Sequence, residues 1–243
     1  MKAMVINEIF YSLQGEGFLA GVPSVFVRLA GCPLRCRWCD TKYAWDNKAG
    51  EDNTIADITK TVQQWSCKFV VITGGEPMIN SELPQLVKEL KTAGKHITIE
   101  TAGITGWDGL EAREFTARMA VPQMPCDLMS ISPKLSNSVP DDAKASAAHE
   151  DSRLDIAVLQ ELLDNYEYQL KFIVDSQDDL PEIRQTIEKI GSVNPEKVML
   201  MPQAATREEL LAKSLIVAEM CRQTGFTFCQ RLQVLLWNNQ KGK

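Results

Sequence analysis

Short runs of β-branched and apolar residues alternate with helical patterns along this chain, and this alternation limits the fold more than any other feature. Six runs are predicted to be strands: Ser24–Leu29, Phe69–Ile72, His96–Glu100, Leu128–Ser132, Gln169–Val174 and Val198–Met201. Two parallel strands must be joined by a long crossover connection, which is usually a helix. Strands that alternate with helices therefore predict an α/β fold with a parallel sheet.

Several of the helices carry their own start or stop signals. Leu83–Ala93 ends before Gly94, and Leu180–Ile190 has a proline in its first turn. The segment Thr206-Arg-Glu-Glu209 is a capping box, which opens a further helix. A last strand is expected at Gln230–Val234.

One stretch lacks this patterning. Residues Ser136–Ser152 are rich in Ser, Asp, Ala and Asn, and we interpret them as a surface insertion or mobile loop before a helix at about Asp155–Asn165. The default expectation for His149 is a solvated side chain. The sequence thus predicts one domain, residues 1–243, with a surface insertion at about 135–166.

Composition excludes several classes of protein. The 243 residues are 44% hydrophobic and 24% charged, and no apolar run approaches the roughly 20 residues that a membrane span needs. A net charge of −6 argues against a general nucleic-acid-binding protein, because phosphate neutralisation needs a basic field. Seven cysteines form an odd set, and the N-terminus lacks a signal-peptide pattern. We therefore expect a soluble protein in a reducing compartment, the cytoplasm.

Three cysteines lie within eight residues, in the segment Cys32-Pro-Leu-Arg-Cys36-Arg-Trp-Cys39. A closed zinc site or a fully ligated four-iron cluster needs four protein donors, and this segment supplies three. We favour an iron–sulfur cluster whose open iron binds a small molecule that carries an amine and a carboxylate. A structural zinc site completed by Asp40, Cys67 or His96 is the alternative. The remaining cysteines are expected to be core or partly buried thiols: Cys67, Cys126, Cys221 and Cys229.

Polar or glycine-rich motifs follow four successive predicted strands. They are the cysteine segment, Thr73-Gly-Gly-Glu-Pro77, Glu100-Thr101-Ala-Gly103 and Ser132-Pro-Lys134. In parallel α/β folds the strand ends and the loops after them build the site. A Gly-Gly pair leaves backbone groups open to a ligand, although the same pair before proline is also an ordinary turn.

These motifs resemble the radical S-adenosylmethionine (SAM) superfamily. Its C-x3-C-x2-C motif, with an aromatic residue before the last cysteine, matches Cys32–Cys39, and its segment that contacts the methionine moiety of SAM matches Gly74–Pro77. Within the superfamily the chain is similar to the 7-carboxy-7-deazaguanine synthase family over nearly its whole length. The matching motifs include Leu13-Gln-Gly-Glu-Gly17, Cys39-Asp-Thr41 and Ser132-Pro-Lys134.

The resemblance implies a partial parallel (β/α) barrel, a homodimer, and a lyase that uses a 4Fe–4S cluster, SAM and Mg²⁺. In that family 6-carboxy-5,6,7,8-tetrahydropterin is converted to 7-carboxy-7-deazaguanine with release of ammonia, in queuosine and related 7-deazapurine biosynthesis. The reduced cluster cleaves SAM, the 5′-deoxyadenosyl radical removes a hydrogen from C6 of the pterin, and SAM is regenerated. A flavodoxin-like or other donor would supply the electron.

The resemblance also implies roles for individual residues, none of them as a catalytic side chain. Cys32, Cys36 and Cys39 would ligate the cluster, and Thr41 would bind Mg²⁺. The substrate would contact Leu13, Gln14, Gly15, Glu16, Arg28 and Thr73. SAM would contact Trp38, Cys39, Asp40, Gly75, Ser132, Pro133, Lys134, Met201, Pro202, Gln203 and Ala204.

Elementary chemistry agrees with the substrate roles. A pterin has a flat edge of donors and acceptors for Gln14 and Glu16, and a guanidinium such as Arg28 can bind its carboxylate with two hydrogen bonds. The alternative for Arg28 is an ion pair at the edge of the core. Mg²⁺ keeps several waters and takes few protein donors, so the Thr41 hydroxyl suffices if substrate oxygens complete the coordination.

Three other functions stay open. A glycyl-radical-activating enzyme shares the cluster motif, but Leu13–Gly17 and Cys39–Thr41 argue against it. The second is a zinc-stabilised interaction module without catalysis, and the third is a radical SAM enzyme that acts on another small heterocycle. Some family members end in a segment with a histidine near the substrate. This chain has Gln230-Arg-Leu-Gln-Val234 there, so its C-terminal contacts are not predicted.

Overall fold

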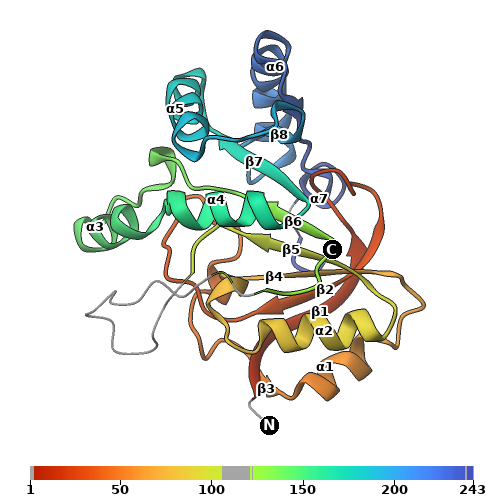
Figure 1. Cartoon of the computed structure of the whole chain (residues 1–243). Coiled ribbons are helices and arrows are strands. Elements are labelled where there is room, and N and C mark those ends of the chain that lie inside the picture. The colour runs from red at the N-terminus through yellow and green to blue at the C-terminus, as the bar shows by residue number, and fades with distance from the viewer. Residues whose placement is uncertain (1–2, 106–120, 122, 239, 243) are drawn as a thin grey trace.

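The computed structural model describes residues 3–105, 121, 123–238 and 240–242, whose strands form one sheet in the order β3-β1-β2-β4-β5-β6-β7-β8-β9 (Figure 1). The strands are β1 (Met4–Leu13), β2 (Pro23–Leu29), β3 (Glu51–Asn53), β4 (Phe69–Gly74), β5 (His96–Thr101), β6 (Leu128–Ile131), β7 (Tyr168–Val174), β8 (Val198–Pro202) and β9 (Thr227–Phe228). From β2 to β9 neighbours pair in parallel, whereas β1 pairs antiparallel with β2 and β3. The predicted partial parallel barrel is confirmed, with β3 and β9 as its open edges.

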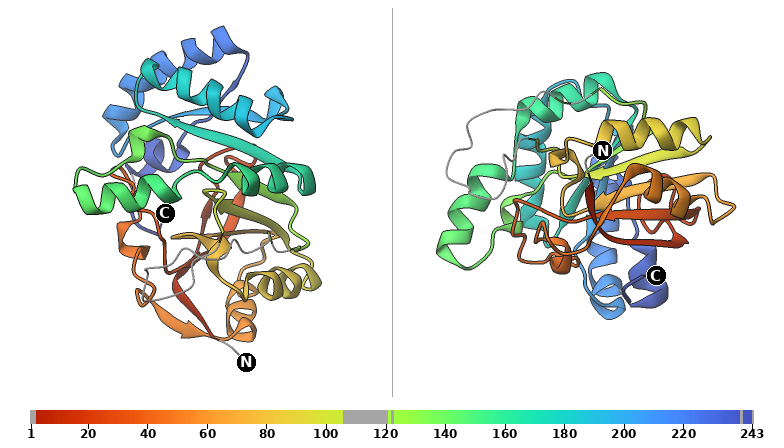
Figure 2. Two further views of the ribbon diagram at one scale, coloured as in Figure 1. Left: turned by 60° about the vertical axis from the view of Figure 1, so that its left-hand side comes forward. Right: turned by 90° about the horizontal axis from the view of Figure 1, so that it is seen from below.

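Helices join the parallel strands and cover the outer side of the sheet, where α2, α4, α5 and α6 follow one another (Figure 2). They are α1 (Ile55–Val62), α2 (Leu83–Thr92), α3 (Ala143–Ser152), α4 (Ile156–Asn165), α5 (Leu180–Ile190), α6 (Arg207–Thr224) and α7 (Leu232–Trp237). Leu83, Leu86, Val87 and Leu90 recur at helical spacing and make the buried side of α2. Within the described part of the chain, no helix has the length and apolar character to cross a membrane.

Strand β7 shows how the sheet separates a core from a site. Leu170, Phe172 and Val174 are at most 1% exposed and belong to the main hydrophobic core. The alternate residues Gln169 and Lys171 are equally buried but polar. Because successive strand residues point to opposite faces, one face of β7 packs on the helices and the other carries polar groups on the concave side.

Parallel register brings the motif-bearing strand ends to one edge. Arg28 lies opposite Thr73 and Leu29 opposite Gly74 in the β2–β4 pair, and Thr101 lies opposite Ile131 in the β5–β6 pair. All six strands predicted from the sequence are present, as are the helices expected at 83–93, at 180–190 and after the capping box. Thr206 accepts a hydrogen bond from the Glu209 N–H, and the Glu209 carboxylate accepts one from the Thr206 N–H.

The strand expected at Gln230–Val234 is wrong. Residues 232–237 form the short helix α7, while the last strand, β9, is residues 227–228. Val234 is fully buried against Ala204 and Leu210, and Leu235 packs beside it. A run this short satisfies both a strand and a helix pattern, so its apolar residues alone could not decide between them.

The predicted helix at 155–165 is confirmed as α4, but the preceding stretch is not a loop and its histidine is not solvated. Helix α3 occupies residues 143–152, and His149 on it is 1% exposed. The Arg35 N–H donates to His149 Nδ1 at 3.0 Å, so Nε2 carries the proton and donates to Ser138 Oγ at 2.9 Å. His149 therefore joins α3 to the cysteine segment.

This burial makes stability depend on pH. Desolvation, reinforced by Arg153, lowers the pKa of His149 to about 4 from an ordinary value of 6.5. Between these values the unfolded chain binds more protons, so stability is complete above pH 6.5 and falls as the pH drops toward 4. We expect a loss of about 2 kcal/mol between pH 6.5 and 5, at about 1.4 kcal/mol per pH unit.

Urea unfolding of the wild type and His149→Gln at pH 7 and pH 5 measures this contribution. The wild type should lose about 2 kcal/mol more than the variant over that interval. Equal losses in the two proteins would contradict the assignment of a buried, neutral His149.

Candidate active site

A cavity of about 300 Å³ opens at the carboxyl ends of the parallel strands. The structure brings almost all of the predicted site residues to its wall. Those that line it are Leu13, Gln14, Gly15, Glu16, Arg28, Cys32, Cys36, Trp38, Cys39, Asp40, Thr41, Thr73, Gly75, Ser132, Lys134, Met201, Pro202 and Gln203. Pro133 and Ala204 are not among the lining residues.

The cysteine segment is held against the Gly-Gly turn by backbone hydrogen bonds. The Gly75 N–H donates to Leu29 O at 3.0 Å, and the Glu76 N–H donates to Gly31 O at 2.9 Å. A Cβ on Gly75 would lie 2.0 Å from Gly31 O and 2.8 Å from Cys32 Cβ. Only glycine allows this close approach of the two backbones.

A buried carboxylate fixes the same turn to β5. Glu76 is 2% exposed and accepts hydrogen bonds from Thr101 Oγ1 at 2.6 Å and the Ala102 N–H at 2.8 Å. It also accepts one from the Met78 N–H at 3.0 Å. Burial raises the pKa of Glu76, and these donors oppose the rise. The turn is thus tied to the next strand end along the sheet.

Three thiols face the cavity from one segment. Cys32 and Cys36 are 7% and 6% exposed, and Cys39 is partly buried. Burial raises the pKa of Cys32 to about 12 and that of Cys36 to about 11, while the Lys134 ammonium favours the Cys36 thiolate. Lys134 Nζ also lies 5.6 Å from the Trp38 ring centroid and donates to Ser132 Oγ at 3.0 Å. Ser132–Lys134 is therefore beside the cysteines, as predicted.

The donor set fits a cluster with three cysteine ligands better than zinc. Cys67 donates to Pro23 O at the beginning of β2, and His96 begins β5, so both lie at the opposite strand ends. Asp40 pairs with Arg231 Nη2. In the residues that the structure describes, no three His, Cys, Asp or Glu side chains are arranged around a single metal ion. The other cysteines are buried or partly buried, as expected.

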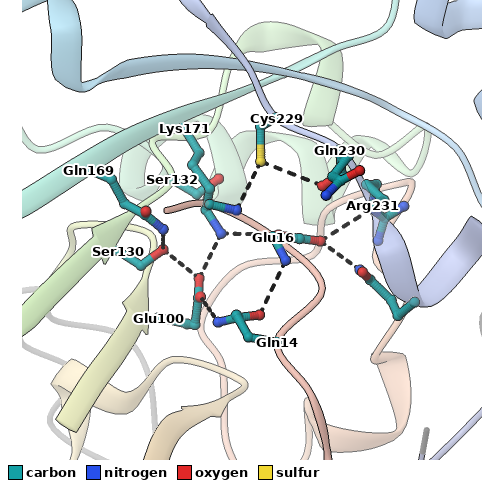
Figure 3. Close-up of polar contacts among 12 residues, drawn as sticks. Gln14, Glu16, Glu100, Ser130, Ser132, Gln169, Lys171, Cys229, Gln230 and Arg231 are labelled. Atoms are coloured by element: carbon teal, nitrogen blue, oxygen red, sulfur yellow. Dashed lines mark hydrogen bonds and ion pairs between the residues drawn. The ribbon is translucent and has the colours of Figure 1, made fainter. Parts of the chain in front are cut away.

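An ion network also lines the cavity, and its polar contacts are drawn in Figure 3. Lys171, 1% exposed, donates to Glu16 Oε2 at 3.0 Å and to Glu100 Oε2 at 2.8 Å. Gln14 Nε2 donates to Glu100 Oε1 at 3.1 Å. Burial alone would raise the pKa of Glu16, but Lys171 and Arg231 outweigh it and hold the pKa at about 2. The cavity therefore presents an ionised Glu16, with Glu100 held beside it by Lys171 and Gln14.

The C-terminal segment completes this wall. Arg231 Nε donates to Glu16 Oε1 at 3.2 Å, and Gln233 Nε2 donates to the same oxygen at 2.7 Å. Because an ionised carboxylate only accepts, the amide orientation of Gln233 is determined, and its Oε1 lies against Gly15. A Cβ on Gly15 would be 1.8 Å from that oxygen, which explains glycine at this position.

Arg28 makes the ion pair that the sequence analysis gave as its alternative role, and it also lines the cavity. Its Nε donates to Glu8 Oε1 at 2.7 Å, which is the core-edge ion pair, and Tyr43 OH donates to the same oxygen at 3.0 Å. The guanidinium also lines the cavity between the Phe10 and Tyr43 rings. Among the described residues, neither terminal nitrogen of Arg28 has a hydrogen-bond partner.

Sequence reasoning missed the polar wall residues Lys171, Arg231 and Gln233, and it placed Glu100 in a strand-end motif without giving it a role. A signal existed for Lys171, since a lone lysine interrupts the apolar strand Tyr168–Val174. Arg231 and Gln233 had no such signal, because they reach the site only through the turn before α7 and the first turn of that helix.

Comparisons with known proteins agree with this geometry. The profile of the Radical SAM superfamily matches residues 27–139. A 7-carboxy-7-deazaguanine synthase from Rhodopirellula baltica is 38% identical over 245 residues, which cover 99% of this chain and 89% of the relative. Another, from Halobacterium salinarum, is 38% identical, and the match covers 98% of this chain and 91% of the relative. The crystal structure of QueE from Escherichia coli has a similar fold, with a TM-score of 0.67, 24% identity and 93% of each chain covered.

The close approach at Gly75 gives a direct test of how the cysteine segment is held. We expect Gly75→Ala to push that segment outward, at a cost of about 1–3 kcal/mol for an overpacked contact, and to lose most of its iron and sulfide. Gly21→Ala is the control, because Gly21 has a positive φ of 88° but nothing within 4 Å of its Cβ position. Iron and sulfide analysis after anaerobic reconstitution compares the two. Full cluster content in Gly75→Ala would show that the segment tolerates the displacement.

Proposed function

Since this chain belongs to the 7-carboxy-7-deazaguanine synthase family of the radical SAM superfamily, we propose that it converts 6-carboxy-5,6,7,8-tetrahydropterin to 7-carboxy-7-deazaguanine with release of ammonia. One observation carries the proposal: a single cavity is lined by three cysteines and by a network of carboxylates paired with Lys171 and Arg231. The carboxylates suit the N–H donors of a pterin edge, and the cysteines suit a cluster. The product belongs to queuosine or a related 7-deazapurine pathway.

Cys32, Cys36 and Cys39 would hold the 4Fe–4S cluster, which leaves one iron for the amine and carboxylate of SAM. When bound and reduced, the cluster supplies the electron that cleaves SAM to the 5′-deoxyadenosyl radical. Around it, Trp38, Asp40, Gly75, Ser132–Lys134 and Met201–Ala204 would position SAM. The Gly75 turn offers backbone groups without a side chain in the way, and Lys134 provides a cation for a carboxylate.

The substrate would occupy the carboxylate side of the cavity. Gln14 and Glu16 would bind the pterin edge, with Leu13, Gly15 and Thr73 against the ring. Toward the residues that the structure describes, Arg28 uses only its Nε, on Glu8, so its terminal nitrogens would bind the substrate carboxylate. Glu100 joins this set through its hydrogen bond from Gln14.

Thr41 would bind Mg²⁺. Its hydroxyl lines the cavity and, within the described residues, has one polar neighbour, Cys39 Sγ at 3.5 Å. A hard cation prefers oxygen donors and keeps water, so substrate oxygens and waters would complete its coordination. The ion would orient the substrate rather than stabilise the fold.

We also propose a homodimer, a flavodoxin-like or other electron donor, and a cytoplasmic location. A cluster with an open iron needs an external reductant and a reducing compartment that keeps its three cysteine ligands as thiolates. The insertion at about 135–166 would brace the cysteine segment, because the Arg37 N–H donates to Ser138 O and Trp38 Nε1 donates to Asn137 O.

The function is tested by an anaerobic assay with the tetrahydropterin, SAM, Mg²⁺ and reductant. We expect the wild type and Cys126→Ala to form the deazaguanine product, and Cys36→Ala to form neither product nor 5′-deoxyadenosine. Cys126 is a fitting control because it is a partly buried thiol away from the cavity. Product formation by cluster-replete Cys36→Ala, or none by the wild type, would defeat the proposal.

Arg28 gives a second prediction. Arg28→Lys keeps the charge but not the two-pronged geometry, so we expect kcat/KM to fall on the order of a hundredfold, with cluster content and SAM affinity unchanged. Arg28→Ala should be worse. Glu8→Gln is the matched control, because it removes the charge that Arg28 pairs with while Arg28 stays in place. Equal losses in Glu8→Gln and Arg28→Lys would mean that Arg28 serves only its ion pair.

A further inference from the structure

Arg231 makes a contact with each of three separate segments of the cavity wall. Arg231 is 8% exposed, and its Nε donates to Glu16 Oε1 at 3.2 Å. Nη2 donates to Asp40 Oδ2 at 2.5 Å, and Nη1 donates to Ala204 O. All three nitrogens of one planar group are thereby used, each on a different segment. Figure 3 shows Arg231 approaching Glu16 from the C-terminal segment.

The partners of Arg231 fall on two sides of the cavity. Glu16 follows β1 and belongs to the pterin side, whereas Asp40 follows Cys39 and Ala204 follows β8, both on the SAM side. A guanidinium is rigid and planar, so its three nitrogens keep fixed relative positions. A ligand that moves or orders Asp40 and Ala204 therefore acts on the same rigid group that orients Glu16.

We propose that Arg231 is a positioning residue that couples the binding of SAM to the binding of the pterin, through its simultaneous contacts with Asp40, Ala204 and Glu16. The inference rests on the proposed function, which assigns the two ligands to the two sides. Arg231 acts through Glu16 rather than on the reacting atoms. Its effect is on how much the binding of one ligand raises the affinity for the other.

Glu16 has other partners besides Arg231, so replacing Arg231 should remove the coupling without destroying the pterin site. Without Arg231, Glu16 keeps Lys171 at 3.0 Å and Gln233 at 2.7 Å. Asp40, whose side chain is 32% exposed, loses the partner that the structure gives it. The pterin site should therefore survive by itself, while its link to the SAM side is lost.

Calorimetric titration of the holoprotein tests the proposal. The cluster is kept oxidised and no reductant is added, so SAM stays intact, and the probe is 6-carboxypterin, an aromatic analogue without the reactive C6 hydrogen. Its affinity is measured with and without saturating SAM. We expect SAM to tighten binding by at least about fivefold in the wild type, the lower end of ordinary coupling. In Arg231→Met the ratio should fall to within about twofold of one.

Two further variants make the result specific. Asp40→Ala breaks the link from the SAM side and should also abolish the coupling, which covers the case in which Arg231→Met does not fold. Arg222→Met removes an exposed arginine that pairs with Glu219 at the far end of α6, and it should keep the wild-type ratio.

The outcomes distinguish the two proposals. If the wild type does not bind 6-carboxypterin and forms no product from the tetrahydropterin, the proposed function fails. If the wild type binds the pterin but SAM leaves its affinity unchanged, or if Arg231→Met and Asp40→Ala keep the wild-type ratio, the coupling role of Arg231 is overturned and the proposed function stands.

Discussion

The backbone contact between residues 29–31 and 74–76 is the constraint on which the site depends. It continues the parallel pairing of β2 and β4 beyond the strand ends, with the Gly75 N–H on Leu29 O and the Glu76 N–H on Gly31 O. The approach requires a residue without Cβ at position 75. Glu76 then ties the turn to β5 through Thr101 and Ala102. The cysteine segment is thus positioned by the sheet itself.

Charge balance governs a second part of the cavity, which extends from Glu100 and Glu16 to Asp40 beside the cysteines. Glu16, Glu100 and Asp40 face only two buried cations, Lys171 and Arg231, within this cluster. A buried ion pair is weak evidence for stability, since desolvation offsets much of its attraction. Its effect here is on geometry: the two cations hold the three carboxylates in place, and they also keep the pKa of Glu16 low. One negative charge in excess also favours a ligand that brings N–H donors or a cation.

How far the sequence predicts this molecule depends on which face a residue occupies. The six parallel strands and their terminal motifs were predictable, because both faces of such strands are buried and their apolar runs are distinct. Strand β1 was missed, since Asn7 and Glu8 interrupt its pattern where the register with β2 shifts. His149 was misjudged because α3 has little apolar patterning, and its burial comes from Arg35 and Ser138 far away in sequence. Arg231 depended on long-range contacts in the same way.

The alternation along β7 explains how one strand serves both stability and chemistry. Leu170, Phe172 and Val174 contribute to the core, so the strand's position is set by apolar burial on the helix side. That support allows Gln169 and Lys171 to hold polar groups on the concave side, where Gln169 binds Ser130 and the Phe18 N–H. In a closed core these groups would be costly, because each would need a protein partner. Here both groups have protein partners, and Glu16 and Glu100, which pair with Lys171, also line the cavity, which is why the ion network and the cavity occupy the same face.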